Sequence, residues 1–501
     1  MVPQKALLEG PSEKPSRKPC VPPVGATDWP IRSVSSGSPT PLVPTSSSAS
    51  PRRVLSVLFV GVLLAAFDLA MTGPVLPALR DAFGLAPRAA SWMFGVFVLF
   101  NLMGVPLLTR LADRWGRRRV FTAALALFGV GAAIVASAPS YAGVLAGRAV
   151  QGVAASGIFP AATAVIGDVY PSERRGRALG ILGAVYGIAF LIGPALAGIV
   201  LAVGTWTWLY AGLVPVALGV AGVAWRVLPT ATVRPSQPLD VPGIVTLGVA
   251  LALGAYGVNQ IDATQPLGSL LSFSSGGCLV GAVLVGMAFV TVERRAPAPL
   301  LRLSLFRDAQ VVRASLLAVG AGMVETSFIF FADLAVAAFG VDQSTASFML
   351  LPLVGAVALG SPVAGRLLDR VGAPAVVRGG TALLTGGVAL LAWMPSDRVA
   401  FYTGSVALGL GLAVLLGSAL SYILLEAAGE AERTVVQGLN TLSLGVGQLL
   451  GSALVGAVAA SASGVVGYTY AFALLTGVGL ACAAIAWGLR PTRSVESPST
   501  P

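Results

Sequence analysis

The sequence predicts an all-α membrane protein with fourteen transmembrane helices, and three observations support this prediction. Hydrophobic residues make up 55% of the 501 residues, well above the share in a soluble globular domain. From Val54 onward the chain contains a series of apolar segments that are each long enough to cross a bilayer as a helix. Charged residues are only 11% of the chain, and they gather in the short loops between these segments.

Each apolar segment predicts one spanning helix, because polar or charged breaks separate it from the next. The residues before the first segment are rich in Pro, Ser and Gly, which predicts a disordered tail over residues 1–52. The predicted spans cover residues 54–78, 89–110, 119–138, 141–168, 178–202, 206–227, 241–261, 271–292, 310–338, 344–366, 374–394, 398–425, 434–460 and 467–489.

A short charged sequence occurs twice, each time directly after a long apolar segment. Leu111–Arg119 reads LADRWGRRR, and Gly365–Gly372 reads GRLLDRVG, so both contain the pattern L-x-D-R-x-G. A charged turn at matching places in two halves indicates a duplicated membrane transporter.

The distribution of basic residues predicts the orientation of the chain. If the N-terminus is cytoplasmic, the external loops hold only Arg80, Arg88 and Arg398, and Arg148 lies inside a predicted helix. All other Lys and Arg residues then fall on the cytoplasmic side, as the positive-inside rule expects. This arrangement predicts that both termini are cytoplasmic. It also explains the net charge of +11 without a nucleic-acid partner.

The composition argues against several other classes of protein. The chain has no histidine, and its three cysteines are far apart, so no metal site or disulfide framework is expected. It has no G-x-x-x-x-G-K-[ST] motif, which argues against direct use of ATP. No soluble catalytic domain or cluster of catalytic groups is present, so we expect neither an enzyme nor a bound cofactor. The composition alone does not exclude a channel.

Four motifs together resemble those of the major facilitator superfamily. One is the charged loop at Leu111–Arg119, and a second is R-x-x-Q-G at Arg148–Gly152. A third, at Phe67–Leu79, places an acidic residue ahead of a proline. The fourth is a fifth-helix motif associated with antiporters, formed here by Gly180, Gly193, Pro194 and Gly198.

Two further segments are similar to the fourteen-helix drug/proton antiporter branch of that family. They are the helix pair at 241–261 and 271–292 and the sequence GLNTLSLGVGQLLG at Gly438–Gly451. The resemblance implies the major facilitator fold, with two six-helix bundles and an inserted helix pair. The implied parts are a cytoplasmic tail (1–52), an N-terminal bundle (53–228), the inserted pair with its loops (229–300), a C-terminal bundle (301–490) and a second cytoplasmic tail (491–501).

Asp68, Arg148 and Glu325 are the candidates for proton coupling. A carboxylate in the middle of the first helix is costly in lipid, so Asp68 is expected to face the bundle interior or a cavity. Arg148 is the available counter-charge, and the resemblance implies that both residues bear on proton coupling. The alternative is a structural polar lock between the two helices.

The candidates for the substrate cavity are Glu325, Asp333, Gln151, Phe328 and Asn440. On one helix Glu325 and Asp333 would lie about 80° apart around the axis and about 12 Å apart along it, so they are not expected to form a pair. Glu325 is expected to bind a cationic substrate or a proton. Phe328 is suited to stacking on a lipophilic cation, but packing in the core or against lipid is the favoured explanation for this ring.

The charged loops are candidates for a conformational latch, which is the role that the resemblance implies for them. The alternative is that their charges only set the orientation of the chain. The latch residues are Asp113, Arg114, Gly116, Arg117 and Arg118 in the first half, Asp369 and Arg370 in the second, and Asp168 as a partner. On the fifth helix, Gly180, Gly183, Gly187 and Gly198 are expected to allow a neighbouring helix to approach closely. The alternative is an ordinary proline kink at Pro194 in a glycine-rich helix.

The leading hypothesis is therefore a monomeric multi-pass transporter of the cell membrane. It would export small lipophilic or cationic compounds by alternating access, driven by proton entry. Export of a metabolite such as an amino acid or a siderophore is the alternative, and an uptake symporter is less favoured. Its expected partners are a small-molecule substrate, protons and the lipid bilayer.

Overall fold

The computed structural model describes residues 50–230, 238–427 and 433–490 of the chain. Most of the first predicted tail and all of the second lie outside this part, as do two short loop segments. The described residues form helices joined by short turns and contain no strand. Fourteen of their helical segments are long and apolar enough to cross a membrane, which confirms the predicted number of spans.

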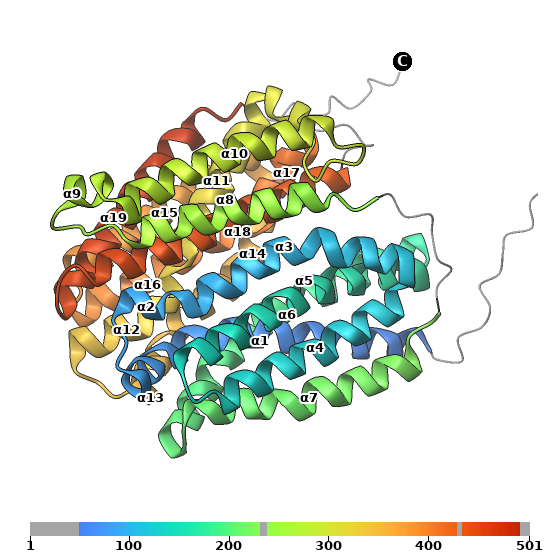
Figure 1. Cartoon of the computed structure of the whole chain (residues 1–501), viewed down its shortest axis with the longest axis horizontal. Helices are drawn as coiled ribbons and strands as arrows, with labels where there is room; N and C mark the ends of the chain where they lie inside the picture. The colour runs from blue at the N-terminus through green and yellow to red at the C-terminus, as the bar shows by residue number, and fades with distance from the viewer. Residues whose placement is uncertain (1–49, 231–237, 428–432, 491–501) are drawn as a thin grey trace, which may run out of the picture. The chain divides into compact units, whose positions relative to one another are not determined.

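The spans follow one another in three groups along the chain (Figure 1). The first six are α1 (Pro51–Phe83), α3 (Trp92–Trp115, preceded by the short α2, Pro87–Ala90), α4 (Arg117–Ser137), α5 (Tyr141–Val169), α6 (Ser172–Val203) and α7 (Trp206–Val227). The next two are α8 (Val241–Asn259) and α10 (Cys278–Arg295), joined by α9 (Pro266–Leu271) and η1 (Phe273–Gly277). After η2 (Leu303–Arg307), the last six are built from α11 (Ala309–Glu325) with α12 (Ser327–Phe339), α13 (Gln343–Met349) with α14 (Leu351–Val371), α15 (Ala373–Trp393), α16 (Arg398–Leu415) with α17 (Ser418–Ala427), α18 (Arg433–Ala459) and α19 (Val465–Trp487).

Three of the predicted spans in the last group of six consist of two helices each. The ninth span breaks at Thr326, between α11 and α12. The tenth breaks at Leu350, and Pro352 then lies in the first turn of α14, where a proline needs no hydrogen-bond partner. The twelfth changes from α16 to α17 at Leu416 and Gly417. Continuous apolar segments predicted these spans as single helices, since hydrophobicity alone does not show where a helix changes direction.

The helices pack mainly within the first and the last groups of six, and a smaller set of contacts joins the groups. In the first group α5 packs on α3 and α4, α7 on α4, and α6 on α1. In the last group α18 packs on α11, and α15 packs on α16 and α19. Contacts of α1 with α12, α6 with α13 and α3 with α18 join the two groups. The inserted α8 lies against both α3 and α18, and α10 packs on α8.

Glycines bring α11 and α18 into close contact beside the break in the ninth span. A Cβ atom at Gly451 would lie 2.6 Å from Met323 Cα, and Cβ atoms at Gly322 and Gly447 would meet carbonyls of the facing helix. Such small residues let two helix backbones approach each other in lipid. At the break itself, the Thr326 hydroxyl donates to the Met323 carbonyl (2.6 Å), which satisfies one acceptor at the end of α11.

The repeated charged sequence has the same backbone geometry in both halves. Gly116 joins α3 to α4 with φ 90°, and Gly372 joins α14 to α15 with φ 79°. Each glycine N–H donates to the carbonyl four residues earlier, Ala112 or Leu368, at 3.0 Å. Positive φ favours glycine, so the shared glycine of the pattern has a direct structural cause.

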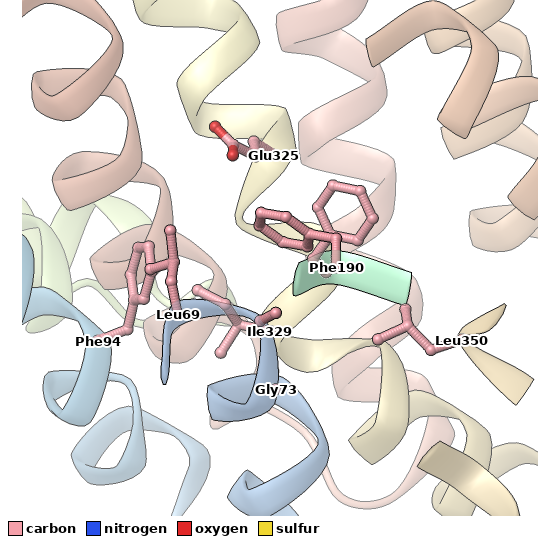
Figure 2. Close-up of a pocket in the computed structure, with 9 residues that line it drawn as sticks. Leu69, Gly73, Phe94, Phe190, Glu325, Ile329 and Leu350 are labelled. Atoms are coloured by element: carbon pink, nitrogen blue, oxygen red, sulfur yellow. The ribbon is translucent and has the colours of Figure 1, made fainter. Parts of the chain in front are cut away.

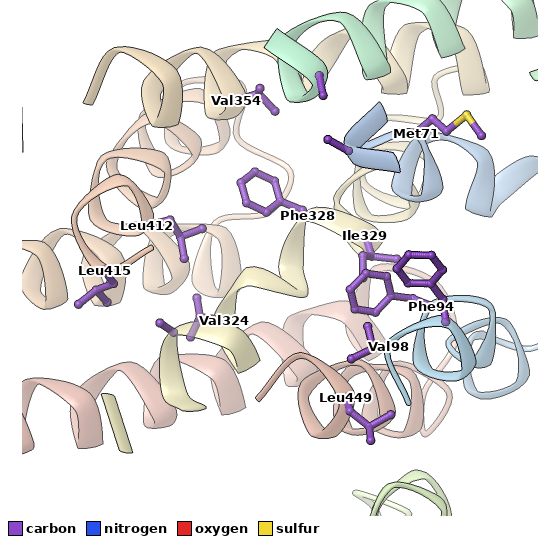
Figure 3. Close-up of a cluster of buried hydrophobic side chains, with 14 of the residues drawn as sticks. Met71, Phe94, Val98, Val324, Phe328, Ile329, Val354, Leu412, Leu415 and Leu449 are labelled. Atoms are coloured by element: carbon purple, nitrogen blue, oxygen red, sulfur yellow. The ribbon is translucent and has the colours of Figure 1, made fainter. Parts of the chain in front are cut away.

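Consecutive spans run in opposite directions, so the bundle has two ends. We call the end that carries Arg80 the Arg80 end and the opposite one the Asp113 end. Between them an apolar cluster joins helices of both groups, with Met71 of α1 and Phe94 of α3 near Ile329 of α12 (Figure 3). The side chains of this cluster pack between the two groups of helices.

Candidate functional site

A fully buried polar cluster links α1 and α5 inside the first group. Arg148 Nη1 lies 2.7 Å from Asp68 Oδ2 and donates to Gln151 Oε1 at 2.9 Å. The Gln151 amide in turn donates to Asp68 Oδ1 at 3.2 Å. All three side chains have 0% exposure. The ion pair predicted from Asp68 and Arg148 is therefore present, and the glutamine of R-x-x-Q-G completes it.

The surrounding helices hold the guanidinium of Arg148 in place. Its Nε donates to the Met93 carbonyl of α3 at 3.1 Å, and its Nη2 lies 3.4 Å from Thr72 Oγ1 of α1. The Phe97 ring lies over it, 4.4 Å from ring centroid to Cζ. Both Asp68 oxygens have a donor, so this carboxylate is compensated in the way that a buried charge requires.

Glu325 lies at the break of the ninth span and faces a small cavity between the two groups (Figure 2). Its carboxylate accepts a hydrogen bond from Gln448 Nε2 of α18 at 2.8 Å. No ion pair involves it among the described residues. Two aromatic rings of this cavity, Phe190 and Phe328, have centroids 5.8 Å apart. The other lining residues are Leu69, Ala70, Gly73, Phe94, Ile329 and Leu350.

The cavity beside Glu325 has a volume of about 20 Å³. This is room for about one water molecule, whereas sites for drug-sized ligands are about 300–1,000 Å³. The cavity is closed by a tight contact between α1 and α12, since a Cβ at Gly73 would lie 2.7 Å from the Phe328 carbonyl. In this conformation, therefore, the cavity is too small for a drug-sized ligand.

Asp333 lies on α12 toward the Arg80 end and has partners of its own. Its Oδ1 is 3.0 Å from Arg80 Nη1, and the same Nη1 is 2.7 Å from the Tyr468 hydroxyl. Glu325 and Asp333 thus contact different groups, as expected for residues that do not form a pair. Asn440 lies elsewhere, where its amide donates to Ser421 Oγ at 3.3 Å. It does not line the cavity at Glu325.

Sequence analysis missed three partners that the fold supplies: Gln448, Arg80 and Tyr468. Gln448 lies within the segment 438–451, which resembles a segment of the fourteen-helix branch, so the sequence did mark this region. Arg80 was assigned only to the external charge count, and nothing in the sequence pointed to Tyr468. Each pairs with a residue far away in the chain, and one sequence does not show which helix faces meet.

At the Asp113 end, an ion pair between described residues joins two members of the first group. Arg117 pairs with Asp168 and also donates to the Ala164 carbonyl at 2.6 Å. The Arg118 guanidinium lies over the Trp225 ring at 4.7 Å. Asp113 has no hydrogen bond or ion pair with another described side chain. Arg114 and Arg370 are exposed, and the side chain of Asp369 lies outside the described residues.

The glycine-rich motif of α6 makes close contacts only in its second part. A Cβ at Gly193 would lie 2.7 Å from Ala70 Cβ of α1, and a Cβ at Gly198 would lie 2.9 Å from the Phe348 ring. At Gly180, Gly183 and Gly187 no described atom lies within 4 Å of such a Cβ. The expected close approach at these three positions is therefore wrong for this conformation. Pro194 lies inside α6, which continues through it.

Comparison with known proteins gives the family. The model of the Major Facilitator Superfamily matches residues 58–312 and 314–501. The puromycin resistance protein pur8 of Streptomyces alboniger is 29% identical over 496 residues, which cover 91% of this chain and 96% of that protein. The tetracenomycin C resistance and export protein of Streptomyces glaucescens is 28% identical over 423 residues, covering 83% and 77%.

Solved structures share the fold at low sequence identity. A D-xylose–proton symporter has a TM-score of 0.64 and 14% identity, covering 88% of this chain and 98% of that one. The human organic anion transporter MFSD10 (TETRAN) has a TM-score of 0.60 and 19% identity, covering 87% and 100%. The fourteen spans, the repeated turn and the family match agree. The chain therefore belongs to the major facilitator superfamily, and it is a membrane transporter rather than an enzyme.

Proposed function

We propose that this transporter exports small lipophilic or cationic compounds in exchange for protons, by alternating access. The proposal rests mainly on the surroundings of Glu325. This acidic side chain faces an aromatic cavity between the two groups of helices, and its one hydrogen-bond partner among the described residues is the Gln448 amide. A carboxylate in that setting favours a ligand that brings a positive charge. The names of two relatives, which refer to resistance and export, support the direction of transport.

Glu325 is proposed to recognise the positive charge of the substrate. Phe190 and Phe328 provide apolar faces beside it, and a cation over such rings gains cation–π stabilisation. The cavity must widen before it can admit a substrate. We infer that it widens when residues 53–228 and 301–490 move as two bundles, since the contact of Gly73 with α12 lies between them.

Asp68 is proposed to carry the proton. In this structure its carboxylate holds Arg148 and Gln151, and so it ties α1 to α5. A proton on Asp68 would remove the negative charge that pairs with Arg148. The link between the helices would then weaken, so proton uptake would change helix packing. The chain has no histidine that could take this role.

The basic loops are proposed to lie in the cytoplasm together with both termini, and the Arg80 end outside the cell membrane. Contacts between the two groups lie at the central cavity and toward the Arg80 end, as Arg80 with Asp333 and Gln343 with Asp81 (2.6 Å) illustrate. We therefore interpret this conformation as closed to the outside.

Transport into proteoliposomes tests the proposal, with a cationic dye and a neutral amino acid compared under an imposed pH gradient. Acid on the side of the Arg80 end should drive the dye toward that side, and reversing the gradient should reverse the movement. Maleimide access to a cysteine introduced at the exposed Thr264 reports which way the protein is inserted. Transport of the amino acid but not of the dye would favour the metabolite exporter.

Two variants separate the proposed roles. Asp68→Asn keeps the shape of the side chain but has no carboxyl group to protonate, so it should abolish gradient-driven accumulation and leave dye binding intact. Glu325→Gln should weaken binding of the cationic dye about tenfold or more, since it removes the charge that faces the cavity. If Asp68→Asn still accumulates the dye with pH as the only driving force, Asp68 is a structural lock and Glu325 becomes the better proton site.

A further inference from the structure

A second cavity, distinct from the one at Glu325, lies at the Arg80 end and has a volume of about 340 Å³. Its charged and hydroxyl side chains are Arg80 and Asp81 of α1, Asp333 of α12, Ser463, and Tyr468 of α19. Asp81 and Ser463 are exposed, so the rim reaches the surface, whereas Asp333 is only 3% exposed. The volume falls within the range of sites for small organic ligands.

Among the described lining residues of this cavity, the buried side-chain atom without a hydrogen-bond partner is an acceptor. Arg80 contacts Asp333 and Tyr468, and its Nε donates to the Leu85 carbonyl at 3.3 Å. Asp333 has only its Oδ1 engaged, and its Oδ2 is buried without a hydrogen-bond partner. An unpartnered buried carboxylate oxygen is costly unless a donor reaches it in another state.

The charge around the cavity also favours a cation. Its charged side chains are one arginine and two aspartates. The last turns of α1, α12 and α18 contribute Arg80, Val336 and Ala459 to the wall. The C-terminal end of a helix carries a partial negative charge, so these three ends add to the negative potential, and they outnumber the one positive end that α19 contributes at Gly464. An anion is therefore disfavoured here, although an arginine is present.

The Arg80–Asp333 pair lies between parts of the chain that must separate if the Arg80 end is to open. Arg80 belongs to the first group of spans, whereas Asp333 and Tyr468 belong to the last. Next to it, Gln343 of α13 donates to Asp81 of α1 at 2.6 Å. Opening between α1 and α12 would break the ion pair and leave the Asp333 carboxylate inside the cavity.

We propose that Asp333 is a second cation-binding site, which Arg80 occupies in this conformation and which takes the ammonium or amidinium group of a departing substrate once α1 and α12 separate. Arg80 then has two roles. Its ion pair with Asp333 keeps this end closed, which we call the gate, and when the pair re-forms Arg80 displaces the substrate cation from Asp333. The proposal goes beyond the central site at Glu325, and it rests on the proposed alternating access.

The test measures how fast a polar maleimide reacts with a cysteine in the cavity of the purified full-length protein. The reporter is Val336→Cys, in a background from which Cys20, Cys278 and Cys482 have been removed. Arg80→Gln and Asp333→Asn should each speed labelling about tenfold or more, because one partner of a partly buried ion pair that joins the two groups is lost. The matched control is Arg398→Gln, an exposed arginine whose recorded partner, the Phe339 ring, lies in the same group of spans. It should leave the rate unchanged.

The cation site is tested in the Arg80→Gln protein, where Asp333 is free. Benzylammonium should slow labelling several-fold, and neutral benzyl alcohol at the same concentration should not. Adding Asp333→Asn to Arg80→Gln should remove the protection. Tyr468→Phe, which deletes only the hydroxyl next to Arg80, gives a milder variant in case Arg80→Gln fails to fold, and size-exclusion chromatography monitors folding.

Equal labelling of the Arg80→Gln and Arg398→Gln proteins would overturn the gate. Faster labelling that benzylammonium does not slow would overturn the cation site. The assay uses no proton gradient and no transport step. A failure of proton coupling would therefore leave its result unchanged and can be told apart from a failure of this inference.

Discussion

At the scale of single residues, the shape of the Arg148 side chain matters as much as its charge. Its guanidinium contacts Asp68, Gln151, Thr72 and the Met93 carbonyl at once. A lysine in its place would keep the positive charge, but an ammonium is a compact point donor and does not reproduce a planar fork. Arg148→Lys should therefore leave at least one buried acceptor without a donor.

We expect Arg148→Lys to destabilise the protein by about 1–3 kcal/mol, the range for an unsatisfied buried polar group. Thermal unfolding in detergent measures the loss. Arg114→Lys makes the same change at an exposed position of the Asp113 end and should leave the unfolding temperature unaltered. Equal stability of the Arg148→Lys protein would show that charge alone holds the cluster together.

The sequence predicted the polar cluster at Asp68 better than the one at Asp333. Asp68 and Arg148 are both ionisable residues inside apolar spans, and few such residues are available to compensate each other. Arg80 lies near the end of its helix, where a lone charge is ordinary and predicts no partner. Its pairing with Asp333 depends on how α1 and α12 face each other, which a single sequence does not show.

At the scale of secondary-structure elements, one buried side chain at the end of α8 contacts both groups of helices at the Arg80 end. Asn259, at the end of α8, accepts from Trp92 Nε1 at 3.0 Å. Its amide lies 3.1 Å from Ser91 Oγ and 3.2 Å from the Ala453 carbonyl of α18. Asn259 is 1% exposed. One residue thus joins the inserted pair to both groups of helices.

Asn259→Ala should loosen this junction, because it leaves the Trp92 N–H and the Ala453 carbonyl without this partner. We expect faster hydrogen exchange at the ends of α8 and α18 and a lower unfolding temperature, from a loss of about 1–3 kcal/mol. Gln260→Ala is the neighbouring control, since the Gln260 side chain makes no hydrogen bond with a described residue. Unchanged exchange in the Asn259→Ala protein would mean that apolar packing alone holds α8 in place.

The number of spanning helices was predicted correctly, because it follows from the hydrophobicity of each segment. The breaks inside the helices were not predicted, because they involve contacts between helices. All fourteen spans were found, because a segment of about twenty apolar residues is a direct signature of a spanning helix. The breaks at Thr326 and Leu350 were not predicted. The break at Thr326 lies where glycines bring α11 close to α18, and the break at Leu350 lies just before Pro352. A proline at that position is also compatible with the start of a single helix, so it did not predict the break. The glycines of α6 were predicted to pack, but the sequence did not show which of them face a neighbour.

At the scale of the whole molecule, two equivalent turns mark the Asp113 end. Gly116 and Gly372 share their positive φ, so the duplication seen in the sequence extends to the backbone. In this conformation Arg117 pairs with Asp168, whereas Asp113 has no ion-pair partner among the described residues. If the loop is a latch, the partner of Asp113 belongs to the other conformation, in which the Asp113 end is closed.

This difference sets the direction of the last prediction. If the loop is a latch, Asp113→Asn removes a charge that stabilises only the other conformation, so it should leave the unfolding temperature unchanged and slow transport turnover about tenfold, the effect of one charge-assisted hydrogen bond. Asp168→Asn is the matched variant, and it should weaken the present conformation because it breaks the pair with Arg117. Transport rate and membrane abundance are measured together for both variants. If the Asp113→Asn protein transports at the normal rate at normal abundance, the charges of this loop set the orientation of the chain only. A drop in its unfolding temperature would instead place the partner of Asp113 in the conformation described here.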